Sequence, residues 1–110
     1  MLSDHDFQRL AGEALESVSA RLGEAAGDWD FDVDLNQGAL TIEFDDPRER
    51  FVASPNGPVR QIWVSAHVRS YKLDWDGARQ AFVLAASGQT LEDLLVEAIR
   101  KRLPDFSLPD

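Results

Sequence analysis

The chain has 110 residues, a length that suits one domain, and 44% of them are hydrophobic, enough for one core. Its 20 acidic side chains against 11 basic ones give a formal net charge of −9. This charge disfavours nucleic acid and anionic membranes as partners and favours cations and basic protein surfaces. The absence of cysteine excludes disulfides, thiolate metal sites and a cysteine nucleophile. We expect a single domain over residues 1–110, a monomer at low metal.

Targeting signals are not evident. The first residues lack the basic and then apolar pattern of a signal peptide and the arginine-rich character of a transit peptide. No apolar run approaches the roughly 18 residues that a membrane span needs. We therefore expect a cytoplasmic protein that binds neither membrane nor nucleic acid.

Residues 4–26 are predicted to form the first helix. Apolar residues recur there at three- and four-residue steps, as they do on one face of a helix. Ser3 suits the N-cap, and Asp4 and Asp6 place negative charge in the first turn, where the helix dipole favours it. Gly27 is the expected end of this helix.

The pattern then changes to strict alternation. Between residues 28 and 35 acidic and apolar residues take turns, which predicts a strand with one acidic face. A turn at residues 36–38 and a second alternating segment at 39–44 complete a hairpin, which residues 45–47 end.

The rest of the chain predicts more strands and a second helix. Strands are expected at 50–53, 61–66, 70–75 and 81–84, with a loop at 54–58. Thr90 and Asp93 resemble a capping box before about three helical turns that include Arg102 and stop at Pro104. The tail to Asp110 is expected along the surface. This order predicts an α+β two-layer sandwich, with two helices packed on one face of an antiparallel sheet of five to six strands.

Seven acidic residues are candidate metal ligands. They alternate along the predicted first strand or share one solvent face of the first helix: Glu13, Glu16, Glu24, Asp28, Asp30, Asp32 and Asp34. Carboxylates are hard ligands that suit iron, manganese, calcium and magnesium. Strand acids about 7 Å apart do not converge on one ion, so binding would be weak and unselective. The same acids could instead protect a sheet edge or aid solubility.

Trp63 is the second unusual feature. If Ile62 and Val64 face the helices, alternation sends Gln61, Trp63 and Ser65 to the open face of the sheet. A large exposed aromatic side chain is a common binding anchor. The alternative is ordinary packing against neighbouring strand side chains.

Several segments together resemble the frataxin family in its bacterial CyaY type. They are PVRQIW at 58–63, YKLDW at 71–75 and SGQTLEDLL at 87–95, with LNQGALTI at 35–42 and FQRLA at 7–11. The resemblance covers nearly the whole chain in order. It implies two helices on an antiparallel sheet and an acidic ridge that binds Fe²⁺ and Fe³⁺.

The resemblance also implies partners and their contact residues. It implies a regulator or iron donor that binds the cysteine desulfurase and the scaffold of iron–sulfur cluster assembly. Carried over by position, the partner-binding residues are Gln61, Trp63 and Lys72, and we include Asn56 as the asparagine of the preceding loop. The asparagine of the family falls at Ser54, with Asn56 two residues later. The second half of the first helix is poorer in acids than the family pattern, so the strand aspartates carry more of the ridge.

Other chemistry has little support in the sequence. His5 and His67 have no second histidine or cysteine at ligand spacing, and we expect a solvated His5 and a loop residue at His67. Ser87 and Gly88 precede a helix but lack the rest of a phosphate-binding loop. We expect no enzyme, although a ferroxidase-like side activity and an iron-driven oligomer stay open. The alternative function is an acidic adaptor or inhibitor that binds a basic protein without a metal role.

Overall fold

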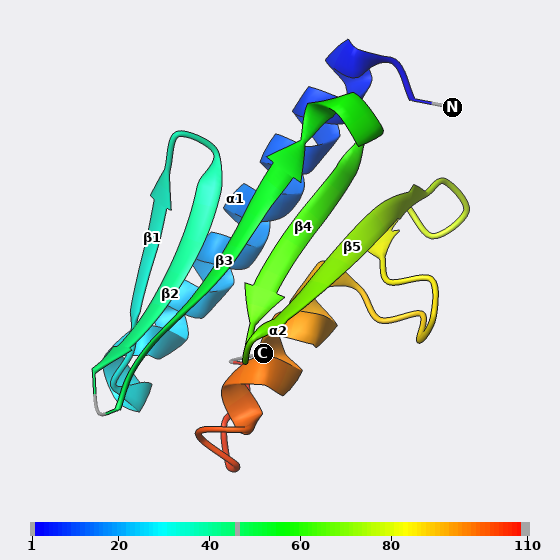
Figure 1. Ribbon diagram of the computed structural model, residues 1–110. Helices are drawn as coiled ribbons and strands as arrows, with labels where there is room; N and C mark the ends of the chain where they lie inside the picture. Colours follow the sequence, from blue (N-terminus) through cyan, green and yellow to red (C-terminus); the bar gives the residue numbers. More distant parts are fainter. Residues whose placement is uncertain (1, 46, 109–110) are drawn as a thin grey trace.

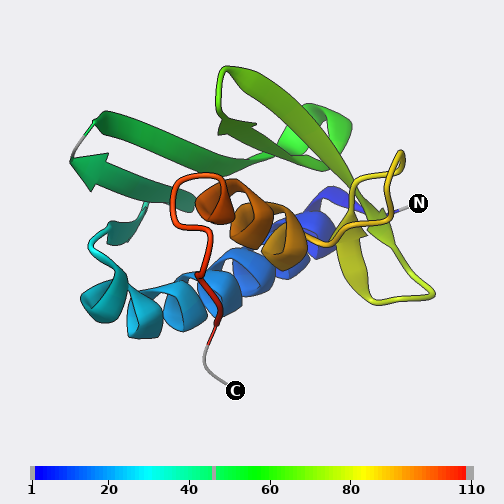
Figure 2. The ribbon, with the colours of Figure 1, turned by 90° about the horizontal axis from the view of Figure 1, so that it is seen from below.

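The computed structural model describes residues 2–45 and 47–108 and shows two layers. The elements are α1 (Asp4–Trp29), β1 (Asp32–Asn36), β2 (Ala39–Asp45), β3 (Arg48–Asn56), the 3-10 turn η1 (Gly57–Val59), β4 (Gln61–Ala66), β5 (Arg69–Asp76), β6 (Ala81–Val83) and α2 (Leu91–Arg100). Both helices lie on the same side of the sheet (Figure 1 and Figure 2). The predicted α+β sandwich is confirmed.

The sheet is a simple meander. Its six strands lie in the order β1-β2-β3-β4-β5-β6, and every neighbouring pair is antiparallel. The predicted first hairpin is confirmed, since Asn36 pairs with Ala39 across a two-residue turn. Gln37 and Gly38 in that turn both have positive φ, the geometry that matches the twist of paired strands.

Alternation along the strands separates a helix-facing side from an open side. On β4, Ile62, Val64 and Ala66 are buried while Trp63 and Ser65 are exposed. The helices supply the other half of the core through residues such as Phe7, Leu15, Leu22, Leu95 and Ile99. Among the described residues every fully buried side chain is apolar, so the polar side chains of the strands gather on the open side.

Both predicted helix caps are present. The Ser3 hydroxyl accepts a hydrogen bond from the Asp6 backbone N–H at 3.0 Å. Thr90 and Asp93 form a reciprocal capping box, each side chain accepting from the other residue's N–H at 3.2 Å. Each cap satisfies backbone donors that the first helical turn leaves free, which fixes where the helix begins.

The predicted end of the first helix was wrong. α1 continues through Gly27 to Trp29, and Asp30 follows as a left-handed C-cap with φ 59°. A glycine inside a helix costs about 1 kcal/mol. The ring of Trp29 packs edge-on against Phe106 at 5.4 Å between centroids, a tertiary contact that offsets this cost. The predicted strand over 28–35 therefore begins only at Asp32.

The third strand is longer than predicted. It covers Arg48–Asn56 rather than residues 50–53, so Ser54, Pro55 and Asn56 lie in a strand and not in a loop. Pairing with β2 stops at Ala53, whereas pairing with β4 continues to Asn56. Pro55 is tolerated because β3 has a partner on only one side at that point.

The C-terminal tail is not a surface segment as predicted. α2 ends at Arg100, so Arg102 lies beyond the helix instead of in it. The chain then turns back and buries Phe106, which is 1% exposed and contacts Phe31 at 5.6 Å between centroids. Arg100 Nε donates to the Phe106 carbonyl at 2.7 Å. Asp46, in the segment 45–47 that was predicted to end the hairpin, and Asp110, at the predicted end of the tail, lie outside the described residues.

Candidate functional site

The open side of the sheet carries both predicted metal ligands and predicted partner-binding residues. Strand alternation and pairing place Asp32 and Asp34 of β1 on the same side as Gln61 and Trp63 of β4 and Lys72 of β5. Strands β2 and β3 lie between the two groups. We call the first group, with its neighbouring acids, the acidic edge, and the second group the aromatic patch. The two share one solvent-facing surface.

The acidic edge surrounds a small cleft at the end of α1. The cleft has a volume of about 360 Å³, and its lining includes Asp30, Asp32 and Asp45 together with Gly27. The C-terminal end of a helix carries partial negative charge, which adds to that of the three carboxylates. This part of the surface therefore attracts cations.

Asp45 was not among the predicted ligands. It ends β2, whose open side also carries Glu43. The signal was present in the sequence, because Thr41, Glu43 and Asp45 alternate with buried apolar residues. Sheet pairing then brings Glu43 directly opposite Asp32 of β1.

The remaining predicted acids are spread out. Asp28 is on α1 rather than on a strand, and Asp34 lies opposite Thr41. Glu13 pairs with Arg9 at 3.2 Å and lines a groove beside β6, the sheet edge opposite β1. Glu16 and Glu24 are exposed on α1 and do not line the cleft. Within residues 2–45 and 47–108, no three His, Cys, Asp or Glu side chains come close enough to hold a metal ion.

The aromatic patch is held by a chain of hydrogen bonds. Trp63 Nε1 donates to Gln61 Oε1 at 2.9 Å, and Gln61 Nε2 donates to Asp74 Oδ1 at 3.0 Å. Lys72 lies opposite Trp63 in the sheet, and its Nζ is 5.0 Å from the centre of the indole ring. These contacts fix the orientation of a tryptophan that is 39% exposed. A fixed aromatic ring loses little conformational entropy when a partner covers it.

The predicted partner-binding residues lie together on the structure. Asn56 pairs with Gln61 across β3 and β4, and Trp63 pairs with Lys72 across β4 and β5. Ser54 stands opposite Trp63 on β3. A hollow of about 270 Å³ lies beside the indole, and its lining includes Ser54, Ser65 and Ser70.

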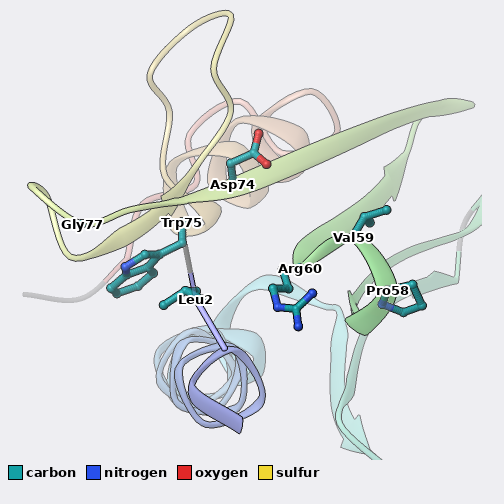
Figure 3. A pocket seen from close by; sticks show the side chains of 7 residues that line it. All are labelled: Leu2, Pro58, Val59, Arg60, Asp74, Trp75 and Gly77. Atoms are coloured by element: carbon teal, nitrogen blue, oxygen red, sulfur yellow. The ribbon is translucent and has the colours of Figure 1, made fainter. Parts of the chain in front are cut away.

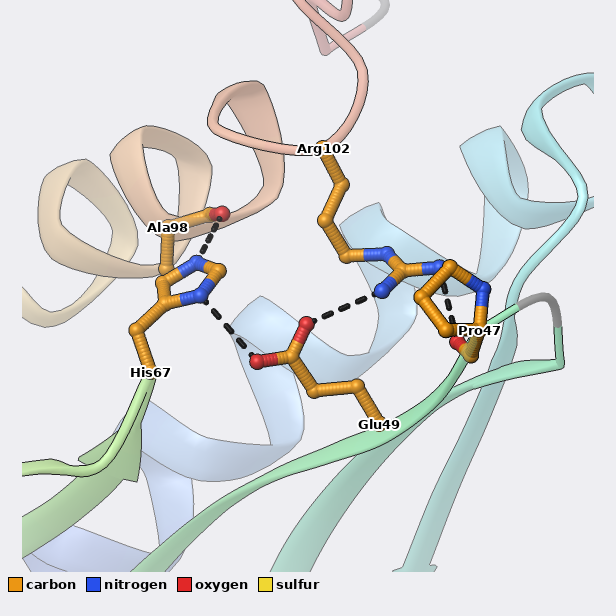
Figure 4. Close-up of polar contacts among 5 residues, drawn as sticks. All are labelled: Pro47, Glu49, His67, Ala98 and Arg102. Atoms are coloured by element: carbon orange, nitrogen blue, oxygen red, sulfur yellow. Dashed lines mark hydrogen bonds and ion pairs between the residues drawn. The ribbon is translucent and has the colours of Figure 1, made fainter.

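His67 is more than the loop residue that was predicted. Its Nδ1 is 3.1 Å from Glu49 Oε2, and its Nε2 is 2.8 Å from the Ala98 carbonyl of α2 (Figure 4). Arg102 Nη1 binds the other Glu49 oxygen at 3.0 Å, and its Nη2 donates to the Pro47 carbonyl at 2.9 Å. The group ties the β4–β5 turn, β3 and the end of α2 together. No local sequence pattern marks it, because its members are far apart in the chain.

Comparison with known proteins identifies the family. The family profile described as a frataxin-like domain matches residues 1–105. A solved structure of the frataxin from Psychromonas ingrahamii, studied within the CyaY protein family, superposes with a TM-score of 0.79 at 23% identity, over 92% of this chain and 91% of that one. Yeast frataxin superposes with a TM-score of 0.71 at 21% identity, over 94% of this chain and 85% of that one.

The chain therefore belongs to the frataxin-like family. Proteins of this family associate with iron and act in iron–sulfur cluster biogenesis, and they are generally non-enzymatic. The two structural matches, both below 25% identity, add evidence for the fold alone. Over the described part of the chain, neither helix has the length and apolar character to cross a membrane.

Proposed function

We propose that this protein binds ferrous and ferric iron weakly at its acidic edge and acts as a regulator or iron donor for the cysteine desulfurase and scaffold of cluster assembly. The observation that carries the proposal is the shared open face. One edge of that face bears Asp32, Asp34 and Glu43 on β1 and β2. Trp63, held by Gln61, stands on β4 of the same face.

The arrangement of the acids supports a hydrated ion. Asp30, Asp32 and Asp45 line one open cleft, and Glu43 faces Asp32 from the neighbouring strand. One or two carboxylates would bind the metal while water fills the rest of its coordination shell, which gives low affinity and low selectivity. Other divalent cations would therefore compete. An ion that keeps open coordination positions can also be passed on to an acceptor.

The partner surface is amphipathic. The acidic edge suits a basic patch on the desulfurase, and the fixed indole of Trp63 suits a hydrophobic pocket near the centre of the contact. Lys72 beside the ring would pair with an acid on the partner. We propose a cytoplasmic monomer at low metal that uses this one face for both metal and protein.

The test is binding to the desulfurase complex, measured by calorimetry with and without Fe²⁺ under anaerobic conditions. The variants are Trp63→Ala and the double change Asp32→Asn with Asp34→Asn. We expect both to weaken binding, and only the acid variant to lose the dependence on iron. Asp105→Asn is the matched control, because Asp105 is exposed in the tail and off this face. Unchanged binding of both variants would refute the partner role.

The alternative function is an acidic adaptor without a metal role, and the same experiment distinguishes it from the proposed iron-dependent role. The wide spacing of the described acids favours it, since no three come close enough to cage an ion. An adaptor would bind a basic partner in a salt-sensitive way, indifferent to iron and to Trp63. Iron-independent binding that Trp63→Ala leaves unchanged would select this alternative.

A further inference from the structure

A second cleft lies where β4 begins and β5 ends, away from the acidic edge. It has a volume of about 640 Å³, and its lining includes Leu2, Val59, Arg60 and Trp75. Figure 3 shows the side chains of Leu2, Arg60 and Trp75 projecting to one side of β5, while Asp74 points to the other side. The lining therefore combines one cationic group with apolar surface, and its one acid, Asp74, points away from them.

Arg60 has no acidic partner in this cleft. Its Nε is buried and has no hydrogen-bond acceptor among the described residues. Asp74, the acid that lines the cleft, instead accepts a hydrogen bond from Gln61. Asp76 accepts from the backbone of the following turn, and Asp6 lies 4.0 Å from Arg9. Although the chain has a net charge of −9, none of the carboxylates of the described residues forms an ion pair with Arg60.

The backbone holds Arg60 in place. It follows the 3-10 turn η1 in the left-handed region with φ 51°, and its N–H donates to the Gly57 carbonyl at 3.2 Å. The left-handed region is uncommon for a residue other than glycine. Arg60 therefore lines the cleft from a backbone conformation that is uncommon for a residue with a side chain.

Because Nε is covered by the protein, the terminal nitrogens are the donors of Arg60 that a ligand in the cleft can reach. A guanidinium donates charge-assisted hydrogen bonds to a carboxylate, and the two terminal nitrogens together present a planar pair of donors that fits its two oxygens. An anion of this kind would supply the acidic partner that the protein does not provide.

The neighbouring surface adds an apolar requirement. Trp75 packs edge-on against Phe82 at 5.1 Å between ring centres, so its indole is held rigidly. Leu2 lies beside it in the cleft (Figure 3). We propose that this cleft is a binding site for a small carboxylate with a flat or branched apolar body. Its carboxylate binds Arg60, and its body packs between Leu2 and Trp75. The site is separate from the acidic edge, and it adjoins the Trp63 face through Asp74, which lines the cleft and accepts a hydrogen bond from Gln61.

The experiment is an NMR titration of the full ¹⁵N-labelled chain with sodium benzoate at constant ionic strength. We expect saturable shifts of the Arg60 and Gly77 amides and of the Trp75 indole N–H, assigned with Trp75→Phe. Benzyl alcohol, which lacks the charge, and acetate, which lacks the ring, should each bind at least about tenfold more weakly, since a tenfold change corresponds to about 1.4 kcal/mol.

Three variants separate recognition from general charge effects. Arg60→Gln should weaken benzoate binding about tenfold or more, and Arg60→Lys should retain part of it by keeping the charge without the fork. Arg69→Gln makes the same charge change at the far end of β5 and should bind like the natural chain. An unchanged dispersion of amide shifts verifies that each variant folds. The proposal is overturned if benzoate gives no saturable shifts, if benzyl alcohol binds equally well, or if Arg60→Gln binds like Arg69→Gln.

Discussion

Asp32 on β1 and Glu43 on β2 stand directly opposite each other in the sheet, and both side chains are exposed. Two like charges in this position repel each other. Glu43 has Arg50 as its register neighbour on β3, whereas Asp32 is on the outer strand. A cation bound at this edge would relieve the repulsion.

Asp32→Asn should therefore stabilise the metal-free protein. The expected gain in the free energy of unfolding is about 0.2–1 kcal/mol at low ionic strength, the range for cross-strand pairs. Urea unfolding followed by circular dichroism measures it, with Asp105→Asn as control for net charge. Added Mn²⁺ should stabilise the natural chain more than the variant. A variant that is less stable than the natural chain without metal would contradict the repulsion.

Trp63→Ala should affect partner binding far more than stability. A central aromatic anchor contributes about 2 kcal/mol or more to an interface, so desulfurase binding should weaken about 30-fold. The ring lies on the open face, and the unfolding free energy should change little. Calorimetry and urea unfolding give the two numbers. Val59→Ala, which truncates another exposed apolar residue, in the 3-10 turn η1 outside the strands, should leave binding intact. Equal losses for both variants would argue against a specific anchor.

Val68→Gly should stabilise the protein. Val68 and His67 form the two-residue turn between β4 and β5, and both have positive φ, at 58° and 51°. This conformation is strained for a β-branched residue, while glycine adopts it readily. Val68 is fully exposed, so its removal loses no packing. We expect a gain of about 0.5–1 kcal/mol in unfolding free energy, after the larger chain entropy of glycine is counted.

The control for that change is Val59→Gly, at an exposed valine without positive φ. It should destabilise the protein, because glycine brings only entropy there. A destabilised Val68→Gly variant would show that the turn is not strained.

His67→Ala should destabilise the fold by about 1–3 kcal/mol, since it removes the partner of Glu49 Oε2 and of the Ala98 carbonyl in a half-buried position, while Arg102 still binds the other Glu49 oxygen. A double-mutant cycle with Glu49→Gln should be non-additive, because the two side chains are in contact. His5→Ala, at an exposed position in the first turn of α1, should have no effect. Fully additive losses would mean that the contact between His67 and Glu49 carries no coupling energy.

Local patterns predicted the elements that depend on local chemistry. The capping box at Thr90, the turn at Gln37 and Gly38, and the alternation around Trp63 all rest on residues close in sequence. They were sufficient for the number of layers, the open face and the position of the aromatic patch.

What the sequence could not reveal rests on contacts between distant residues. The end of α1 depends on Trp29 meeting Phe106, which is 77 positions later, and the role of His67 depends on Glu49 and Arg102. Asp45 joins the acidic cleft only because β2 and the end of α1 come together in space. The periodicity of apolar residues in the sequence does not predict such tertiary contacts.

The most direct test of the acidic edge is an anaerobic Fe²⁺ titration of the ¹⁵N-labelled protein by NMR. At low iron, broadening should concentrate at residues 30–34 and 43–45, and the combined change Asp30→Asn with Asp32→Asn should abolish this local effect. Asp105→Asn should behave like the natural chain. Broadening that is spread evenly over the molecule, or that is unchanged in the Asp30 and Asp32 variant, would contradict an iron-binding edge.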